Sequence, residues 1–342
     1  MSESTGRPAT LQDVAEAAGV SLATASRAIN GSARRVKEPL RLRVLEAATR
    51  LNYQPNLQAQ AVARGRTSVI GLLVHDIADP YFAEIAAGVS EEAERHGLLV
   101  TLASTQRSPE REILHLAGLR AQRAQGVIIA GSRFDDDALA ARLAAEIELF
   151  RGSGGKVTLI SQDIHDADTV RLENRAGARA LAVRLARLGY RRFGFLTAPR
   201  ALITSTERLE GFLEGLEAAG GGEVVATAVA EFTRDGGYDA MTEILESGPE
   251  VDCVVAANDV MAVGAMSAMR DHGVRPADQL AVAGFDDIAT LRDLSPALTT
   301  VRFPLLEVGR MAMTMLLDEA EGTRVRRVRG EVIVRETTPA RS

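Results

Sequence analysis

The sequence has no tryptophan and only one cysteine, Cys253. A single cysteine excludes an internal disulfide framework, and its position in an apolar, strand-like run predicts a buried, unreactive thiol. No apolar run approaches the roughly 20 residues that are needed to span a bilayer. The N-terminus also lacks the basic-then-apolar order of a signal peptide. These absences predict a cytoplasmic protein that does not contact a membrane.

The sequence also lacks the short motifs of common enzyme classes. None of the five histidines has HExxH spacing, and there is no GxSxG elbow, no P-loop and no GxGxxG after the apolar run 69–74. The acidic run 135–137 resembles a metal site only superficially, because carboxylates favour the N-terminus of a helix and this run heads one. We therefore expect a protein that is not an enzyme and that holds no metal and no cofactor.

Length and charge indicate more than one domain. A chain of 342 residues is too long for one ordinary hydrophobic core and suggests two or three domains. Residues 1–66 carry ten basic and five acidic side chains, a net of +5, whereas the whole chain carries −6, so the remainder carries −11. A basic head on an acidic body is typical of a polyanion-binding module attached to a second function. Charge alone is equally compatible with a solvated surface.

Residues 10–30 have the pattern of two short helices joined by a turn. Thr10 and Asp13 form a capping-box-like start, and Gly19 permits the left-handed backbone that ends a helix. Ser21 is a good N-cap for the second helix. The pattern predicts either an ordinary αα-hairpin or a helix-turn-helix, whose second helix enters the major groove of DNA. The exposed face favours DNA, because it carries short or hydrogen-bonding side chains: Leu22, Ala23, Thr24, Ser26, Arg27 and Asn30.

A third helix and a short linker follow. Apolar residues at helical spacing over 40–51 predict a helix that completes a three-helix core, and the residues around Pro55 break it. The segment 57–63 is helix-compatible, but seven residues are too few for a stable isolated helix. It is either a linker or a helix that forms only in a complex. The predicted domains are therefore a disordered tail over 1–9, a helix-turn-helix DNA-binding domain over 10–56 and a hinge helix or linker over 57–66.

From residue 67 onward, short apolar runs alternate with amphipathic helices, which indicates parallel sheets covered on both faces. The predicted strands are 69–74, 98–103, 127–130, 157–160, 193–196, 224–230, 253–257 and 280–284. The predicted helices are 81–96, 109–123, 175–188, 206–219, 238–246 and 260–272. A ligand cleft is expected beyond the carboxyl ends of the strands. The stretch 330–339 reads as a final strand, and the C-terminus has no leucine heptads for a tetramerising coil, so we expect a dimer.

Eight stretches together resemble the lactose-repressor (LacI/GalR) family of transcription regulators, over essentially the whole chain. They are residues 11–21, 24–31, 51–56, 76–84, 208–212, 257–259, 284–287 and 298–301. Each stretch alone is weak evidence for the family, but the whole set, in this order and at these separations, is highly specific for it. The resemblance implies an α + α/β fold with an N-terminal helix-turn-helix head, a short hinge helix and a two-lobed, doubly wound body of periplasmic-binding-protein type. The body spans 67–342, with an N-lobe of about 67–168 and 300–326 and a C-lobe of about 169–299 and 327–342.

The resemblance also implies roles in DNA binding. Leu22, Ala23 and Arg27 fall where the family reads bases in the major groove. Arg27 suits this role because its fork can donate twice to guanine, worth about 1–3 kcal/mol of discrimination, although a plain phosphate contact is the alternative. The positions better assigned to phosphates or to positioning are Ser21, Thr24, Ser26, Asn30 and Tyr53.

The hinge segment matches the family's hinge helix, which folds in the minor groove of the operator. The matching DNA-contact positions are Asn56, Ala59 and Val62. The family inserts a leucine at the operator centre, and this chain has Val62 there. A valine wedge is shorter and is expected to unstack the central base step less.

In the body, the resemblance places Arg208, Asn258 and Asp286 in an effector cleft, where their chemistry suits a polyol. Tyr81, Phe82 and Tyr238 would offer apolar faces. Structural alternatives are a core position for Tyr81 or Phe82, a helix cap for Asn258 and a turn cap for Asp286. Ser132 and Arg133 follow a predicted strand and could reach the cleft. Ser161, which we also expect to contact the effector, and Gln162 stand where many relatives have Asp-Arg in the cleft, so the ligand is not expected to be held as in those relatives.

These patterns predict a repressor that binds a near-palindromic operator on double-stranded DNA as a homodimer. A small-molecule effector, a sugar or sugar derivative, would bind between the body lobes and control it. The alternative is a sugar-binding receptor whose DNA-binding head is inactive. The intact helix-turn-helix pattern and the basic head disfavour that alternative.

Overall fold

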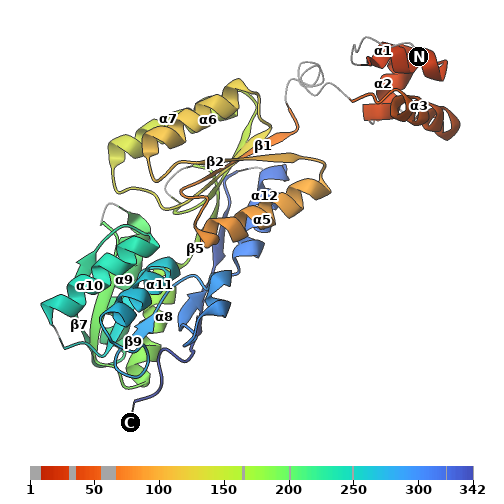
Figure 1. The fold of residues 1–342 in the computed structure, drawn as a ribbon. Coiled ribbons are helices and arrows are strands. Elements are labelled where there is room, and N and C mark those ends of the chain that lie inside the picture. Colours follow the sequence, from red (N-terminus) through yellow and green to blue (C-terminus); the bar gives the residue numbers. More distant parts are fainter. Residues whose placement is uncertain are drawn as a thin grey trace. The chain divides into compact units, whose positions relative to one another are not determined.

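A computed structural model describes residues 9–30, 36–54, 67–163, 166–199, 202–248, 250–320 and 322–341. The chain forms two compact units, residues 1–67 and 68–342, called here the head and the body (Figure 1). Within the described residues, no helix has both the length and the apolar character that crossing a membrane requires.

The head is a bundle of three helices, α1 (Leu11–Ala18), α2 (Leu22–Asn30) and α3 (Glu38–Arg50). The predicted capping box is present: the Thr10 side chain accepts from the Asp13 backbone N–H, and the Thr10 N–H donates to the Asp13 carboxylate at 2.7 Å. Gly19 ends α1 in the left-handed region, at φ 63°. The core consists of small and β-branched side chains from all three helices: Val14, Ala15, Ala18, Ala25, Ala28, Val44 and Ala47. The helix-turn-helix prediction is confirmed.

The first lobe of the body is built on a six-stranded parallel sheet. Its strand order is β11-β5-β4-β3-β1-β2. The strands are β1 (Val69–Val74), β2 (Leu99–Ser104), β3 (Gly126–Ala130), β4 (Lys156–Ile160), β5 (Asp168–Leu172) and β11 (Val325–Val328). Helices α6 (Pro109–Ala121) and α7 (Asp137–Gly152) pack together, as do α5 (Pro80–Arg95) and α12 (Leu305–Leu317), and the two pairs cover opposite faces of the sheet (Figure 1).

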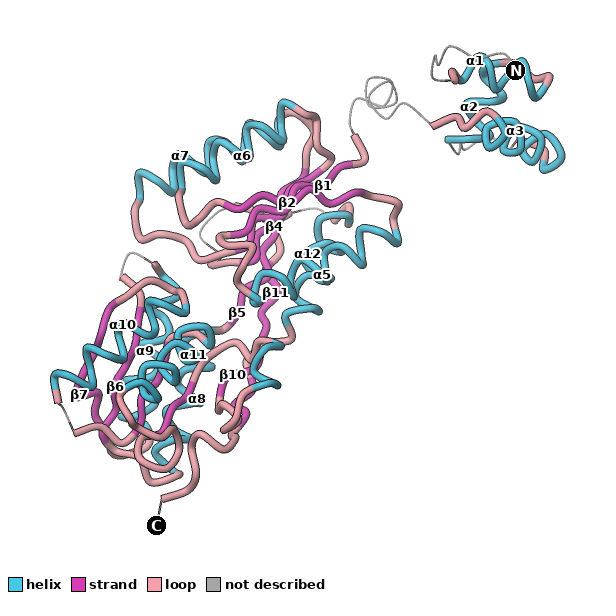
Figure 2. Tube along the Cα trace, in the orientation of Figure 1, coloured by secondary structure: helices cyan, strands magenta, loops and turns pink. Residues whose placement is uncertain are grey.

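The second lobe has a four-stranded parallel sheet of order β7-β6-β8-β9. Its strands are β6 (Arg192–Thr197), β7 (Glu223–Val229), β8 (Cys253–Ala256) and β9 (Ala281–Ala283). Helices α8 (Asn174–Arg187) and α9 (Ile203–Ala218) form one packed pair, and α10 (Arg234–Ser247) and α11 (Asp259–Asp271) form another. An antiparallel pair, β10 (Thr300–Arg302) and β12 (Glu331–Ile333), continues from this lobe. In Figure 2 the strands of the two lobes are seen as two separate groups, coloured magenta.

The continuous apolar runs became strands close to their predicted positions, and Cys253 is buried in β8 as expected. The elements missing from the prediction are β5, β10, β11, α12 and the short 3-10 helix Ala289–Asp293, and α7 was anticipated only as a helix headed by the acidic run 135–137. β5 and β11 carry charged residues between their apolar ones, so neither strand forms a continuous apolar run. The acidic run before α7 does head a helix, because the Asp136 carboxylate accepts from the backbone N–H groups of Ala138 and Leu139 at 2.9 and 3.0 Å.

The chain crosses between the lobes a few residues later than predicted. β5 belongs to the first sheet, so the first crossing follows Leu172. β10 joins the second lobe through bridges from Ala283 to Thr299 and from Asp286 to Arg302, so the second crossing precedes α12. The predicted final strand 330–339 is reduced to Glu331–Ile333.

Candidate functional sites

The second helix of the head presents one face to the core and another to solvent. Ser21 caps α2, because its hydroxyl accepts from the Thr24 backbone N–H at 3.2 Å. Ala25 and Ala28 point into the core, as the helical period requires. The opposite face is exposed and carries Leu22, Ala23 and Arg27, with 47% of Leu22 accessible. This face is the one predicted to read DNA.

The other predicted DNA-binding positions divide into two groups. Thr24 and Ser26 are half-buried on α2, and Tyr53 packs partly against the head core, where burial raises the pKa of its phenol. The Asn30 side chain and the hinge positions Asn56, Ala59 and Val62 lie outside the described residues. The predicted tail up to residue 8 and the hinge 57–66 also lie outside them.

A cavity of about 460 Å³ opens between the lobes of the body, and we call it the interlobe cavity. Its walls are the loops that follow the carboxyl ends of the strands in both sheets, the expected place for a ligand in such folds. The first lobe contributes His75, Asp79, Tyr81, Phe82, Arg107, Gly131 and Ser132. The second lobe contributes Leu202, Thr204, Arg208, Phe232, Asn258 and Asp286.

A buried ion pair forms the floor of this cavity. Arg208 donates from Nη2 to Asp286 Oδ1 at 2.7 Å, and both side chains are about 5% exposed. Arg208 Nε donates to Asn174 Oδ1 at 3.0 Å, and Nη1 donates to the Ala257 carbonyl. The guanidinium also stacks on the Phe285 ring, 4.0 Å from its centroid. These contacts fix the orientation of the guanidinium, and the guanidinium in turn holds the Asp286 carboxylate in place.

Burial raises the pKa of two carboxyl groups at this end of the sheet. For Asp286 the effect of burial is partly offset by the positive charge of Arg208. For Asp259, which accepts from Thr300 Oγ1 at 2.7 Å and from the Ile288 N–H at 3.0 Å, burial raises the pKa to about 6. Asn258 caps α11 through its Oδ1, 3.0 Å from the Met261 backbone nitrogen. Asn258 therefore fills the predicted structural role and lines the cavity as well.

An aromatic wall faces the ion pair. Tyr81 and Phe82 pack edge-to-face with ring centroids 4.9 Å apart. The Phe82 ring also packs against the buried His75 ring, with 5.8 Å between the two ring centroids. Burial, followed by the nearby Asp286 carboxylate, raises the pKa of Tyr81, so its phenol stays protonated and can donate. Burial, together with Arg133 and Arg107, lowers the pKa of His75 well below its ordinary range, which keeps the imidazole neutral.

Tyr238 was predicted to face the ligand, and the structure places it elsewhere. It lies on α10, where its hydroxyl is 3.3 Å from Asp271 Oδ2 on α11, and it does not line the interlobe cavity. The aromatic side chain contributed by this part of the chain is Phe232, in the loop between β7 and α10. The resemblance had suggested Tyr238 for this role; the residue lies within α10, which begins at Arg234 and not at the predicted residue 238.

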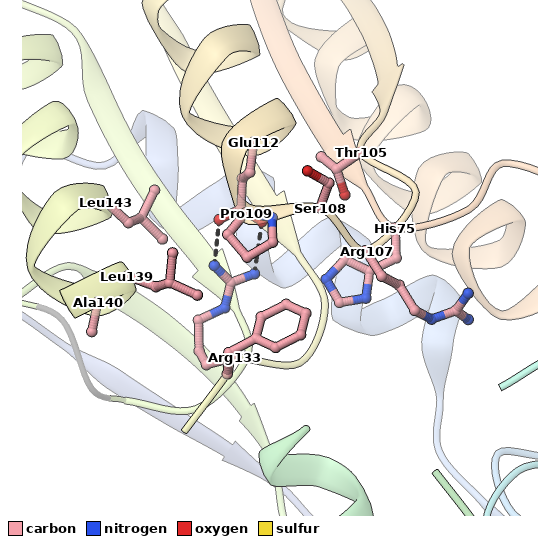
Figure 3. Close-up of a pocket in the computed structure, with 11 residues that line it drawn as sticks. His75, Thr105, Arg107, Ser108, Pro109, Glu112, Arg133, Leu139, Ala140 and Leu143 are labelled. Carbon is pink, nitrogen blue, oxygen red and sulfur yellow. Dashed lines mark hydrogen bonds and ion pairs between the residues drawn. The ribbon is translucent and has the colours of Figure 1, made fainter. Parts of the chain in front are cut away.

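Arg133 and Ser161 were also expected in the cleft, and they are buried beside it instead. Arg133 forms a two-pronged ion pair with Glu112 (Figure 3), with Nη2 3.0 Å from Oε2, and its Nε donates to Ser161 Oγ at 3.1 Å. A buried guanidinium needs a carboxylate partner, and Glu112 on α6 supplies it. Ser132 does line the interlobe cavity, where its hydroxyl accepts from the Thr204 backbone N–H at 3.0 Å.

Sequence reasoning missed several residues of the interlobe cavity. They include His75, Asp79, Arg107, Thr204 and Phe232. His75 directly follows β1, and Arg107 lies just beyond β2. Since the carboxyl ends of parallel strands meet at one edge, inspection of every residue just beyond a predicted strand would have found these two. Phe232 gives no such signal, because its loop is positioned only by tertiary packing.

The head and the body each match a known family. The family described as bacterial regulatory proteins, lacI family, matches residues 10–56. The family described as periplasmic binding proteins and sugar binding domain of LacI family matches residues 67–335.

Individual relatives match over nearly the whole chain. The transcriptional regulator GalS of Salmonella typhimurium is 33% identical over 320 residues, which cover 92% of this chain and 91% of GalS. The ribose operon repressor of Halalkalibacterium halodurans is 32% identical over 333 residues, which cover 96% and 97% of the two chains. A crystal structure of the lac repressor dimer bound to operator and the anti-inducer ONPF has a TM-score of 0.83 at 26% identity, covering 98% of this chain and 100% of that one. The chain therefore belongs to the LacI family of bacterial DNA-binding transcription regulators.

Proposed function

We propose that this protein is a repressor that binds a near-palindromic operator as a homodimer and is controlled by a sugar in the interlobe cavity. The observation that carries the proposal is a polar cavity lined by both lobes, in a chain whose other unit exposes a helix-turn-helix face. The lac repressor structure, bound to operator as a dimer with an anti-inducer, supports the same arrangement.

The exposed face of α2 would read the operator. Arg27 would donate to guanine O6 and N7, and Leu22 and Ala23 would make apolar contacts such as those to a thymine methyl. Ser21, Thr24 and Tyr53 would contact phosphates, which fix the register without reading sequence. In the hinge, Val62 would enter the minor groove as a short wedge, with Asn56 and Ala59 beside it.

The interlobe cavity suits an uncharged polyol. The Asp286 carboxylate would accept from sugar hydroxyls, and the Asn258 amide can both donate and accept. The Tyr81 and Phe82 rings would pack against the apolar face of a sugar ring. The Arg208 guanidinium, already held by Asp286 and Asn174, would present its remaining donors in a fixed direction.

Occupancy of the cavity would be coupled to DNA binding through the lobes. Hydrogen bonds already cross between them: Arg107 Nη2 donates to the Phe232 carbonyl at 2.9 Å, and the Thr204 N–H donates to Ser132 Oγ. A sugar that changes the lobe angle would change the spacing of the two hinges in a dimer. Typical coupling free energies of about 1–3 kcal/mol change affinity by about 5–150-fold.

The alternative, a sugar receptor with an inactive head, is disfavoured by the exposed reading face of α2. The two functions differ in their dependence on salt, because operator binding releases counterions and should weaken steeply as salt rises. Weak, salt-independent DNA binding would support the receptor.

The decisive experiment is selection of bound sequences from random duplex DNA, with and without a panel of sugars and nucleosides. We expect a palindrome whose recovery is lost in Arg27→Ala and whose affinity changes with one ligand. If no DNA motif is recovered under any condition while a sugar still raises the melting temperature, the repressor function is overturned. The sugar receptor with an inactive head then remains.

A further inference from the structure

The turn between α1 and α2 determines where the DNA-reading face of α2 begins. The Gly19 N–H donates to the Glu16 carbonyl at 3.1 Å. The Val20 N–H donates to the Ala15 carbonyl at 3.0 Å, and these two bonds close the C-terminus of α1. The last carbonyl of this helix, that of Ala18, receives no backbone N–H from the described residues. The final carbonyls of a helix lack intrahelical partners, so this one needs a donor from elsewhere.

Arg43 of α3 supplies that donor. Its Nη2 donates to the Ala18 carbonyl, the one acceptor that the described part of the chain gives to this side chain. The guanidinium also lies over the turn, because a Cβ at Gly19 would be 3.0 Å from Nη2. α1 has no basic residue in its own last turn, so α3 provides the positive charge that stabilises the C-terminus of a helix. The contact therefore joins the turn to a helix that lies 25 positions later in the chain.

The predicted base-reading positions follow directly after this turn. Leu22 and Ala23 are the first two residues of α2, and both are exposed. A tilt of the last peptide of α1 would therefore move both of them relative to the bases. Groups that recognise a partner must be held within about 0.5 Å of their productive positions by the residues behind them. The support of the turn is thus expected to affect which sequences are bound.

A phosphate contact is the ordinary role of an exposed arginine in a DNA-binding domain, and a neighbouring residue allows the two roles to be compared. Arg41 lies two positions before Arg43 on α3 and is also exposed. It pairs with Glu38 of the same helix at 3.1 Å, so it does not hold a second element of the head. Loss of Arg41 removes a charge, whereas loss of Arg43 removes a charge and the support of the turn.

We propose that Arg43 is a positioning residue of the DNA-binding head. It holds the turn between α1 and α2 so that Leu22, Ala23 and Arg27 meet the bases in one fixed arrangement, and it contacts no phosphate itself. The inference rests on the reading face assigned in the proposed function and adds the residue that fixes the orientation of that face.

The first measurement is hydrogen exchange of the free, full-length protein, followed by mass spectrometry. The variants are Arg43→Met, which keeps an unbranched side chain but has no donor, and the matched control Arg41→Met. Arg43→Met should speed exchange of the amides over residues 17–24 by at least ~5-fold and leave those of α3 unchanged. Arg41→Met should change neither segment.

The second measurement is DNA binding by the same full-length variants. The probes are a duplex that the wild type enriches from a random library and a scrambled duplex of the same composition, titrated by fluorescence anisotropy at several salt concentrations. Arg43→Met should lower the ratio of the two affinities by at least ~5-fold, with an unchanged slope of log affinity against log salt. Arg43→Lys keeps a charged donor and should recover part of the ratio, and Arg41→Met should leave the ratio unchanged.

The outcomes separate this inference from the proposed function. If Arg43→Met leaves the ratio unchanged and lowers the steepness of the salt dependence by about 1, Arg43 contacts a phosphate and the positioning role is refuted. Faster exchange over all three helices would indicate a general loosening of the head and would refute the role as well. In either case a motif enriched by the wild type leaves the repressor function standing. If the wild type enriches no duplex, both the reading face and the role of Arg43 fail.

Discussion

Replacing Arg208 by methionine should destabilise the body strongly, because it removes the partner of a buried carboxyl group. Arg208 and Asp286 are each about 4% exposed, and the guanidinium also holds Asn174 and stacks on Phe285. Methionine keeps most of the volume and loses every hydrogen bond. Breaking a buried ion pair from one side costs about 3–5 kcal/mol, and we expect Arg208→Met to lie in this range.

The cost should depend on pH with a defined sign. Arg208 lowers the pKa of Asp286 against the effect of burial, so its removal lets that pKa rise further. In mildly acidic buffer Asp286 of the variant is then neutral, and its burial is cheap. In alkaline buffer the Asp286 carboxyl of the variant is either charged without a partner or protonated, and protonating it costs more free energy the higher the pH. The free energy lost by Arg208→Met should therefore grow as the pH rises.

The measurement is urea unfolding followed by circular dichroism, at several pH values, for the wild type, Arg208→Met and Arg208→Met/Asp286→Asn. The double variant has no unpaired carboxylate, so it should recover ~1–3 kcal/mol in alkaline buffer and little in acid. A single-variant cost below ~1 kcal/mol, or a cost that does not change with pH, would refute the assignment of this pair as a buried ionic contact.

Three further outcomes are expected. Arg27→Ala should weaken operator binding by ~1–3 kcal/mol and relax sequence preference at one position in gel-shift titrations, whereas Arg41→Ala on α3 should leave the preference unchanged. Burial raises the pKa of Asp259 to about 6, so the resulting stabilisation is full below the unfolded pKa of about 3.9. This stabilisation, up to ~3 kcal/mol, is lost as the pH rises through about 6, and a calorimetric melting series should show no such loss for Asp259→Asn. Gly88→Ala should lower the melting temperature by several degrees, because its Cβ would lie 1.9 Å from a backbone oxygen of α12. Gly118→Ala, which meets nothing within 4 Å, should leave the melting temperature unchanged or raise it; equal losses would contradict the close packing of α5 on α12.

Local chemistry made much of this protein predictable. The capping box of Thr10 and Asp13, the left-handed Gly19 and the Ser21 cap are contacts over three residues or fewer, so the sequence determines them almost alone. Strands buried on both faces leave continuous apolar runs, and eight of them were located correctly to within about two residues of their ends. The strands β5 and β11 left no such run, because charged residues stand among their apolar ones: Asp168 and Arg171 in β5, and Arg326 and Arg327 in β11.

Resemblance and spacing also identified Arg208, Asn258 and Asp286, whose side chains the structure brings to one cavity. They could not show that Arg133 would turn away to Glu112, 21 positions earlier, or that Tyr238 would pack on Asp271 instead of on a ligand. The direction of a side chain depends on which partner is in reach, and that is settled only when helices distant in the sequence pack together.

The sequence by itself therefore determined the elements, the division into a basic head and an acidic body, and the family of the protein. Only the tertiary structure decided that loops from seven strands meet between two lobes, that Arg208 and Asp286 form a buried ion pair there, and that the Thr105 hydroxyl is buried without a hydrogen-bond partner among the described residues. The physical reason is the range of the interactions. Helix caps and hydrophobic periodicity act between near neighbours in the chain, whereas a cavity, a buried charge pair and an unpaired hydroxyl are properties of surfaces that come together from opposite ends of the fold.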